Sequence, residues 1–304
     1  MVQNLNSCNL TDLSELKINR KISALLRAKS DIIFVSDVRA GPRLKKLEKK
    51  LLYNDSPYLL HANSTGNKRG VGIMIRKELN CTVNATFKDR DENLLGLNTT
   101  INNENILLAS CYGDNEDGGH NFYNTLQGFI DRANVNYIII GGDFNTVTDP
   151  THITGPADTQ NLDLINMRSN INPRNSVLLN DLLRNNNLVD PFRTKNPLRR
   201  EYSYVPFSQN NKNRSRIDYF FVTANLLNKA IVIYKHKLGT SFDHKPVMLN
   251  LGGKSQKGSK IIDPNLLNSQ SIQDTAKLAA YNTYLSYLPP RATMGTYHNY
   301  SEYN

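Results

Sequence analysis

The sequence predicts a layered α/β or α+β domain over residues 1–252, and two observations support this prediction. Short apolar runs of strand length alternate with amphipathic stretches of helix length, which is typical of sheets covered by helices. The alternation ends after Leu251, where the polar, Gly- and Ser-rich segment 252–259 is typical of a solvated linker. We therefore expect residues 253–304 to be a linker and a partial helical tail.

Each predicted strand is a short run of apolar, β-branched or aromatic residues bounded by residues that favour turns. In chain order these runs are Val2–Asn6, Asp31–Ser36, Tyr58–Asn63, Val71–Arg76, Asn93–Thr99, Asn105–Cys111, Tyr137–Gly141, Tyr202–Val205, Ile217–Thr223, Ala230–Tyr234 and Val247–Leu251.

The predicted helices are longer stretches with helical spacing of apolar residues. In Leu13–Ala28, for example, Leu16, Ile22 and either Leu25 or Leu26 can share a face. The others are Arg43–Leu52, Asn121–Ala133 and Ser176–Asn185. In the tail, Ile272–Leu288 has the length of a helix, but a tail of this size has too little core to fold alone.

The charge balance is basic, since lysine and arginine outnumber aspartate and glutamate by 37 to 27 and the formal net charge is +10. Such a balance favours a polyanionic partner, because neutralising phosphates releases counterions. Charge alone leaves nucleic acid and other partners equally open.

The remaining composition excludes a secreted disulfide scaffold. Residues 1–10 lack the charged and apolar regions of a signal peptide, and no run approaches the ~18 apolar residues of a membrane span. The three cysteines, Cys8, Cys81 and Cys111, match no metal-ligand spacing and leave an odd count. We therefore expect an intracellular protein in a reducing compartment.

Five segments place polar or acidic residues at the ends of apolar runs. They are Leu5-Asn6, Phe34–Asp37, Ile140–Asn145, Ser215–Tyr219 and Ser241–Val247. In the third, an apolar strand delivers Asp143 and Asn145, which lie two residues apart and so point to one side of a strand. We expect the preceding Gly141-Gly142 to let the backbone approach a ligand. For this segment alone, a turn capped by the Asp side chain is an equally good interpretation.

Three further residues need a partner or a role. Asp37 ends an apolar run, where a helix cap or a surface charge is the common alternative. Asp218 lies inside an apolar run, where an unpaired carboxylate is costly. We expect His244, next to Asp243, to be its partner, and a histidine with acids nearby is a candidate for catalysis.

This set of side chains predicts phosphodiester cleavage. The reaction needs a hard cation, a group that activates water, and donors for the developing anion. Carboxylate and amide oxygens are the ligands that Mg²⁺ prefers, and Mn²⁺ is a plausible substitute. The cysteines and clustered histidines of a zinc site are missing from the five segments.

Read in order, the motifs resemble the signature of the endonuclease/exonuclease/phosphatase superfamily. They are Asn6, Asp37, Tyr112, Gly142-Asp143-Phe144-Asn145, Arg216-Ile217-Asp218 and Asp243-His244. The resemblance covers most of residues 1–252. It implies a four-layered α/β sandwich, in which two packed, mostly antiparallel β-sheets are flanked by helices.

The resemblance also implies the catalytic roles. Asp143 would orient or deprotonate the attacking water, and Asn145 would contact the scissile phosphate. His244, polarised by Asp218, would donate to a phosphoryl oxygen. Tyr112, as a catalytic residue, would contact the phosphate or the leaving group.

The implied metal ligands are Asp37, Asn6 and Asp243. Here the chain departs from the family pattern, because Asp37 stands where the family has a longer glutamate. A second departure is the Phe242 inserted in Ser241-Phe242-Asp243-His244, where the family usually has Ser-Asp-His. We expect activity, with an altered affinity for the metal.

The residues expected to contact DNA come from several segments. Asn115 completes a Tyr-x-x-Asn pattern with Tyr112, and Ser203 and Ser215 fall where related nucleases place hydroxyls near the DNA backbone. Lys212, Arg214 and Arg216 belong to a polar, basic hairpin for which a solvated tip is the alternative, and Arg199 and Arg200 precede a predicted strand.

Within the superfamily, the chain is most similar to the endonuclease domain of a LINE-type non-LTR retrotransposon. It starts almost at the first core strand, runs past the fold into a tail and has no Trp. The resemblance implies nicking of double-stranded chromosomal DNA in the nucleus with a 3′-hydroxyl product, and a reverse transcriptase in the same polyprotein. The alternatives are an abasic-site repair endonuclease, a catalytically weak DNA-binding module and, less favoured, a lipid or inositol phosphatase.

Overall fold

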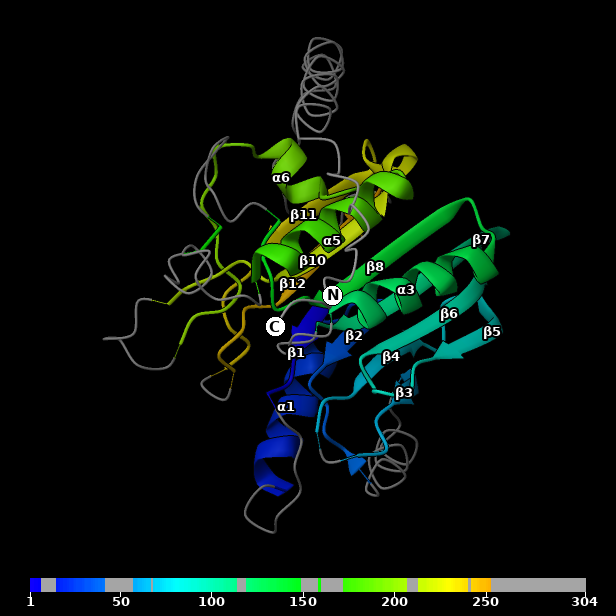
Figure 1. The fold of residues 1–304 in the computed structure, drawn as a ribbon. Coiled ribbons are helices and arrows are strands. Elements are labelled where there is room, and N and C mark those ends of the chain that lie inside the picture. Colours follow the sequence, from blue (N-terminus) through cyan, green and yellow to red (C-terminus); the bar gives the residue numbers. More distant parts are fainter. Residues whose placement is uncertain are drawn as a thin grey trace, which may run out of the picture. The chain divides into compact units, whose positions relative to one another are not determined.

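The two six-stranded sheets of this protein pack face to face (Figure 1). The structure is a computed structural model that describes residues 1–6, 15–41, 57–66, 68–113, 119–148, 158–159, 172–206, 213–239 and 242–252. The predicted tail, 253–304, and the predicted helix Arg43–Leu52 therefore lie outside the described residues.

The first sheet has a short strand, β1 (Val2–Asn4), near its centre. Its order is β11 (Ala230–Tyr234), β12 (Val247–Leu251), β1, β2 (Ile32–Ser36), β4 (Val71–Arg76) and β3 (Tyr58–Asn63). Only β1 and β2 run parallel, so that the residues after Asn4 and after Ser36 emerge at the same edge.

The second sheet repeats this plan. Its order is β5 (Cys81–Lys88), β6 (Leu94–Ile101), β7 (Glu104–Tyr112), β8 (Tyr137–Asp143), β10 (Asp218–Thr223) and β9 (Leu188–Val189). Here β7 and β8 are the parallel pair, and Tyr112 lies opposite Asp143 at their carboxyl ends.

The sheets pack against each other through their inner faces and against helices through their outer faces. Phe34 of β2 meets Phe220 of β10 edge to face across the interior, with ring centroids 5.5 Å apart. The outer face of the second sheet packs against α3 (Gly119–Ala133) and α5 (Asn172–Asn185), and the outer face of the first packs against α1 (Glu15–Arg27). The predicted four-layered sandwich of mostly antiparallel sheets is confirmed.

Most expected elements are present, and the exceptions have physical reasons. The expected strand Tyr202–Val205 is wrong, since only Tyr204 makes single-residue bridges, to Ser215 and His244. Strand β5 was not expected because it is an edge strand whose residues alternate between exposed and half-buried. The short helix α6 (Pro191–Lys195), capped by Asp190, was also not expected. In the described part of the chain, no helix combines the length and hydropathy needed to cross a membrane.

Candidate active site

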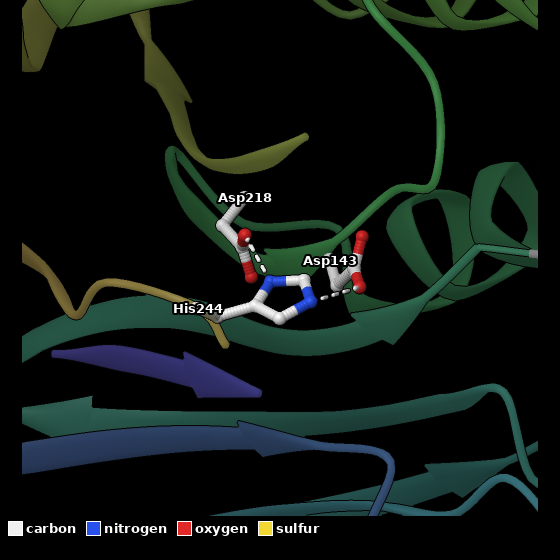
Figure 2. A group of neighbouring side chains, drawn as sticks. All are labelled: Asp143, Asp218 and His244. Carbon is white, nitrogen blue, oxygen red and sulfur yellow. Dashed lines mark hydrogen bonds and ion pairs between the residues drawn. The ribbon is translucent and has the colours of Figure 1, made fainter. Parts of the chain in front are cut away.

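Two strand ends and one loop bring an acidic and imidazole cluster together. Asp143 ends β8 and Asp218 begins β10, and the antiparallel register places them opposite each other. His244 precedes β12 on the other sheet, and its ring lies between the two carboxylates (Figure 2). All three side chains are buried. The predicted pairing of Asp218 with His244 is therefore present.

The His244 ring is held at one nitrogen. Its Nδ1 lies 2.7 Å from Oδ2 of Asp218, and its Nε2 lies 3.9 Å from Oδ2 of Asp143, which is too long for a hydrogen bond. Burial alone would lower the pKa of His244, but Asp218, with Asp143 and Asp243, outweighs burial and raises the pKa to about 9. The imidazolium form is therefore favoured at neutral pH, with Nε2–H directed toward Asp143.

Asp143 is held at both oxygens. The side-chain amide of Asn4 donates to Oδ2 at 2.8 Å, and the backbone amide of Asn145 donates to Oδ1 at 2.9 Å. Burial and the negative charge of Asp218 raise the pKa of Asp143 to about 7, against the opposing effect of His244 and these donors. A carboxylate with such a pKa is suited to exchanging a proton with water at neutral pH.

Asp218 is positioned through its backbone. The amides of Ile217 and Asp218 both donate to Oγ of Ser203, at 3.0 and 2.9 Å, and the Tyr234 hydroxyl donates to the Asp218 carbonyl at 2.9 Å. Its Oδ1 atom is buried with no hydrogen-bond partner among the described residues. The charge of Asp218 is therefore balanced mainly by His244.

A second group of oxygen donors lies at the ends of β1 and β2. Because Leu5 donates its amide to the Ser36 carbonyl at 2.9 Å, Asn6 and Asp37 leave the sheet side by side. The Asn6 amide nitrogen Nδ2 donates to Oδ2 of Asp243 at 2.8 Å. Asn6 and Asp243 are therefore in direct contact, Asp243 is the residue before His244, and Asp37 ends the strand next to that of Asn6.

The donors of this second group fit an oxygen-ligated cation. Oδ1 of Asp243 is buried and has no hydrogen-bond partner among the described residues, which leaves a carboxylate oxygen available to an ion. Asp143, Asp218 and His244 also come close enough to hold an ion. We favour the group around Asp243, because a protonated His244 paired with Asp218 has no lone pair to offer.

Tyr112 and Asn145 border the cluster. Burial, together with the nearby negative charges of Asp143 and Asp37, raises the pKa of Tyr112 above its usual range. Asn145 takes a left-handed backbone conformation, with φ 49°, and its Nδ2 donates to the Gly113 carbonyl at 2.8 Å. Asn115 lies outside the described residues.

Residues 1–241 match the Endonuclease/Exonuclease/phosphatase family. The chain belongs to this family. Members of the family generally depend on a divalent metal, which agrees with the oxygen donors of Asn6 and Asp243.

Solved structures share the fold at low sequence identity. A variant of the 3′ phosphatase NExo from Neisseria, bound to a product DNA hairpin, is 16% identical, with a TM-score of 0.63 over 83% of this chain and 98% of that one. An AP endonuclease from Archaeoglobus fulgidus is 17% identical, with a TM-score of 0.62 over 82% and 97%. The endonuclease domain of TRAS1, a telomere-specific non-LTR retrotransposon, is 13% identical, with a TM-score of 0.55 over 84% and 98%.

One of the DNA contacts predicted for this chain, Arg216, is wrong. Arg216 is fully buried, and its guanidinium donates to both oxygens of Asp158, at 3.0 and 2.6 Å, and to Asp190 at 2.6 Å. It also lies over the Tyr219 ring, 4.6 Å from the centroid. Arg216 therefore stabilises the chain just before Asp218 and cannot reach DNA.

The two predicted hydroxyl contacts are also wrong as surface contacts. Ser203 and Ser215 are buried. Ser203 accepts the two amides described above, and Oγ of Ser215 lies 2.7 Å from Oγ1 of Thr159. Both hydroxyls are used inside the protein.

The remaining basic residues stay predictions. Arg199, Arg200 and Arg214 are exposed, as a DNA contact requires, and Lys212 lies outside the described residues. Arg199 has a weak exposed ion pair with Glu201, at 3.5 Å.

The glycines before Asp143 serve packing rather than a ligand. A Cβ on Gly142 would lie 2.0 Å from the Cys111 carbonyl oxygen, and a Cβ on Gly141 would lie 2.7 Å from Val2 of the other sheet. They let β7 and β1 approach β8. This closeness is what brings Asn4 to Asp143, a site residue that the sequence did not suggest; its only signal was an amide inside a buried strand.

Proposed function

We propose that this chain is a divalent-metal-dependent DNA endonuclease, which nicks a target duplex by phosphodiester hydrolysis and leaves a 3′-hydroxyl. The observation that carries the proposal is the buried arrangement of Asp218, His244 and Asp143 next to the oxygen donors Asn6 and Asp243. Such an arrangement would provide an acid, a base and a cation site within one cluster.

The residues divide the chemistry between them. The His244 imidazolium, fixed by Asp218, would donate from Nε2 to a phosphoryl oxygen and stabilise the charge of the transition state. Asp143, with its raised pKa, would orient the attacking water and accept its proton. Asn145 would contact the phosphate. A divalent ion held by Asn6, Asp37 and Asp243 would neutralise phosphoryl charge.

Support for DNA as the substrate comes from charge and from the comparisons. The net charge of +10 and the exposed Arg199, Arg200 and Arg214 suit a phosphate backbone. The structural neighbours include a protein bound to a DNA hairpin and a retrotransposon endonuclease. On this basis we infer a role in retrotransposon integration in the nucleus, in which the 3′-hydroxyl primes a reverse transcriptase.

The proposal is tested by nicking of supercoiled plasmid by the purified chain. With Mg²⁺ or Mn²⁺ we expect open-circular product that a DNA polymerase extends without end repair. Chelation of the metal or Asp143→Ala should abolish the product. DNA binding without metal-dependent nicking would instead support a catalytically weak binding module, and a 3′-phosphate end would contradict the priming role.

A second candidate is an abasic-site endonuclease. It is favoured by one observation: the Archaeoglobus AP endonuclease overlays with a higher TM-score than the TRAS1 domain, 0.62 against 0.55. Comparing a duplex that contains one abasic site with the same intact duplex separates the two. A strong preference for the abasic duplex would replace the first proposal with the second.

A further inference from the structure

The carboxylate of Asp37, which is expected to bind metal, forms an ion pair with Arg39. Nε of Arg39 lies 2.6 Å from Oδ1 of Asp37, and the side chains are 39% and 4% exposed, respectively. Charge-assisted contacts of this length are among the stronger hydrogen bonds of proteins. One oxygen of a buried acidic side chain at the candidate metal site is therefore already paired with a cation of the chain itself.

The backbone is built to keep this pair together. Asp37 and Arg39 both have left-handed conformations, with φ of 53° and 47°, which are uncommon for residues with a Cβ. The amides of Val38 and Arg39 donate to the carbonyls of Gly70 and Arg69, at 3.0 and 2.7 Å. The strained turn is therefore fixed by a neighbouring loop.

That neighbouring loop leaves little room for the turn to relax. Gly70 has φ +99°, and a Cβ there would lie 2.4 Å from Oγ of Ser64 and 3.3 Å from the Arg39 amide nitrogen. The same Ser64 hydroxyl accepts the Ala40 amide at 3.0 Å. The backbone of Arg39 is thus held by the amides on both sides of it, which keeps its side chain within reach of Asp37.

Arg39 also reaches the rest of the cluster. Its positive charge also acts on Tyr112, and the charges of Asp37 and Asp143 act on the same hydroxyl. A cation at this position neutralises Asp37 and repels a second cation by Coulomb's law.

We propose that Arg39 is an internal counter-ion that competes with the divalent metal for Asp37 and so weakens metal binding. The inference rests on the proposed function in one respect, that Asp37 is a metal ligand. A divalent ion must displace or share the guanidinium of Arg39, and the fixed turn keeps that guanidinium available.

The test is a titration of the full chain with Mn²⁺ in the absence of DNA, with free Mn²⁺ followed by electron paramagnetic resonance. Arg39→Gln removes the charge but keeps a shorter polar side chain with an amide nitrogen or oxygen near the position of Nε, and Arg39→Ala removes the side chain. A partly exposed ion pair of ordinary strength predicts Mn²⁺ binding roughly three- to fivefold tighter than in the wild type.

Two controls assign the effect. Arg184→Ala removes an arginine whose partner, Asp181, lies 3.3 Å away on α5, and it should leave Mn²⁺ affinity unchanged. Adding Asp37→Asn to Arg39→Gln should abolish the gain. Tighter Mn²⁺ binding in either Arg39 variant, with no such gain once Asp37 is replaced by Asn, supports the inference. Unchanged or weaker binding in both, or a gain that survives Asp37→Asn, overturns it.

The result of the Mn²⁺ titration does not depend on whether the chain cleaves DNA. Because no DNA is present, the comparison decides the role of Arg39 even for a chain that cuts no DNA. Absence of nicking by the wild type, with the predicted Mn²⁺ differences intact, would contradict the proposed function alone.

Discussion

Nδ1 of His244 lies 2.7 Å from Oδ2 of Asp218, and this contact joins the two sheets at the candidate active site. Asp218 belongs to β10 of one sheet, and His244 immediately precedes β12 of the other. The pair therefore depends on how the sheets pack as well as on the two side chains. It fixes the ring so that Nε2 faces Asp143.

Asp218→Asn should slow nicking by about 100-fold or more, because it removes the charge that favours the imidazolium and orients the ring. DNA affinity should change little, since Asp218 is buried. Single-turnover nicking and a separate binding titration measure the two effects. Asp181→Asn, a partly exposed position on α5, is the matched control, and equal rates for Asp218→Asn and this control would refute the assigned role.

Ser203→Ala should lower the free energy of unfolding by about 1–3 kcal/mol, because it leaves two buried amide donors without their acceptor. It should also slow nicking, since those amides belong to Ile217 and Asp218. Ser215→Ala loses one hydroxyl contact with Thr159 and should cost less in both respects. Urea denaturation and nicking assays compare them. A variant at Ser203 with wild-type stability and reduced DNA affinity would restore it as a DNA contact.

Arg214 and Arg216 lie two residues apart and should behave oppositely. Arg216→Ala removes the buried cation shared by Asp158 and Asp190, leaves Asp158 with Arg193 alone, and should cost about 3–5 kcal/mol of stability. Arg214→Ala changes an exposed side chain and should leave stability within about 0.5 kcal/mol, while weakening DNA binding and its salt dependence. Thermal melts and DNA titrations at several salt concentrations check both. Retained stability in Arg216→Ala would show that the buried network is dispensable.

The same network predicts a pH dependence of stability. Burial would raise the pKa of Asp158, but Arg216 and Arg193 outweigh burial and lower the pKa below its usual 3.8. A carboxylate whose pKa is lowered by folding stabilises the fold at pH values above its unfolded-state pKa. This stabilisation is lost as the pH falls through the folded-state pKa. Asp158→Asn should therefore be less stable than the wild type at neutral pH, with the difference shrinking only below about pH 4. A difference that stays constant to lower pH would argue against the ion pair.

Much of the fold follows from local patterns. Strands β3, β4, β11 and β12 have the bounds expected from their apolar runs. Strand β5 could not be found in this way, because an edge strand with alternating half-buried and exposed residues has too weak an apolar pattern. The run Tyr202–Val205 has strand composition, but its neighbours pair with it at single residues only.

The candidate site shows a similar division. Asp143 and Asn145 were apparent because they lie at the end of an apolar strand, and His244 because it stands beside an acid just before one. The burial of Arg216 was not apparent, because its partners Asp158 and Asp190 lie 58 and 26 residues away in the chain. Only the packed structure shows which of two neighbouring arginines faces the interior.

The central claim is that His244 provides the acid of a metal-dependent nuclease, and the most direct measurement is single-turnover nicking by His244→Ala at saturating Mg²⁺ and DNA. We predict a rate lower by roughly 10²- to 10⁴-fold with nearly unchanged DNA affinity. A His244→Ala variant that nicks as fast as the wild type would contradict the account.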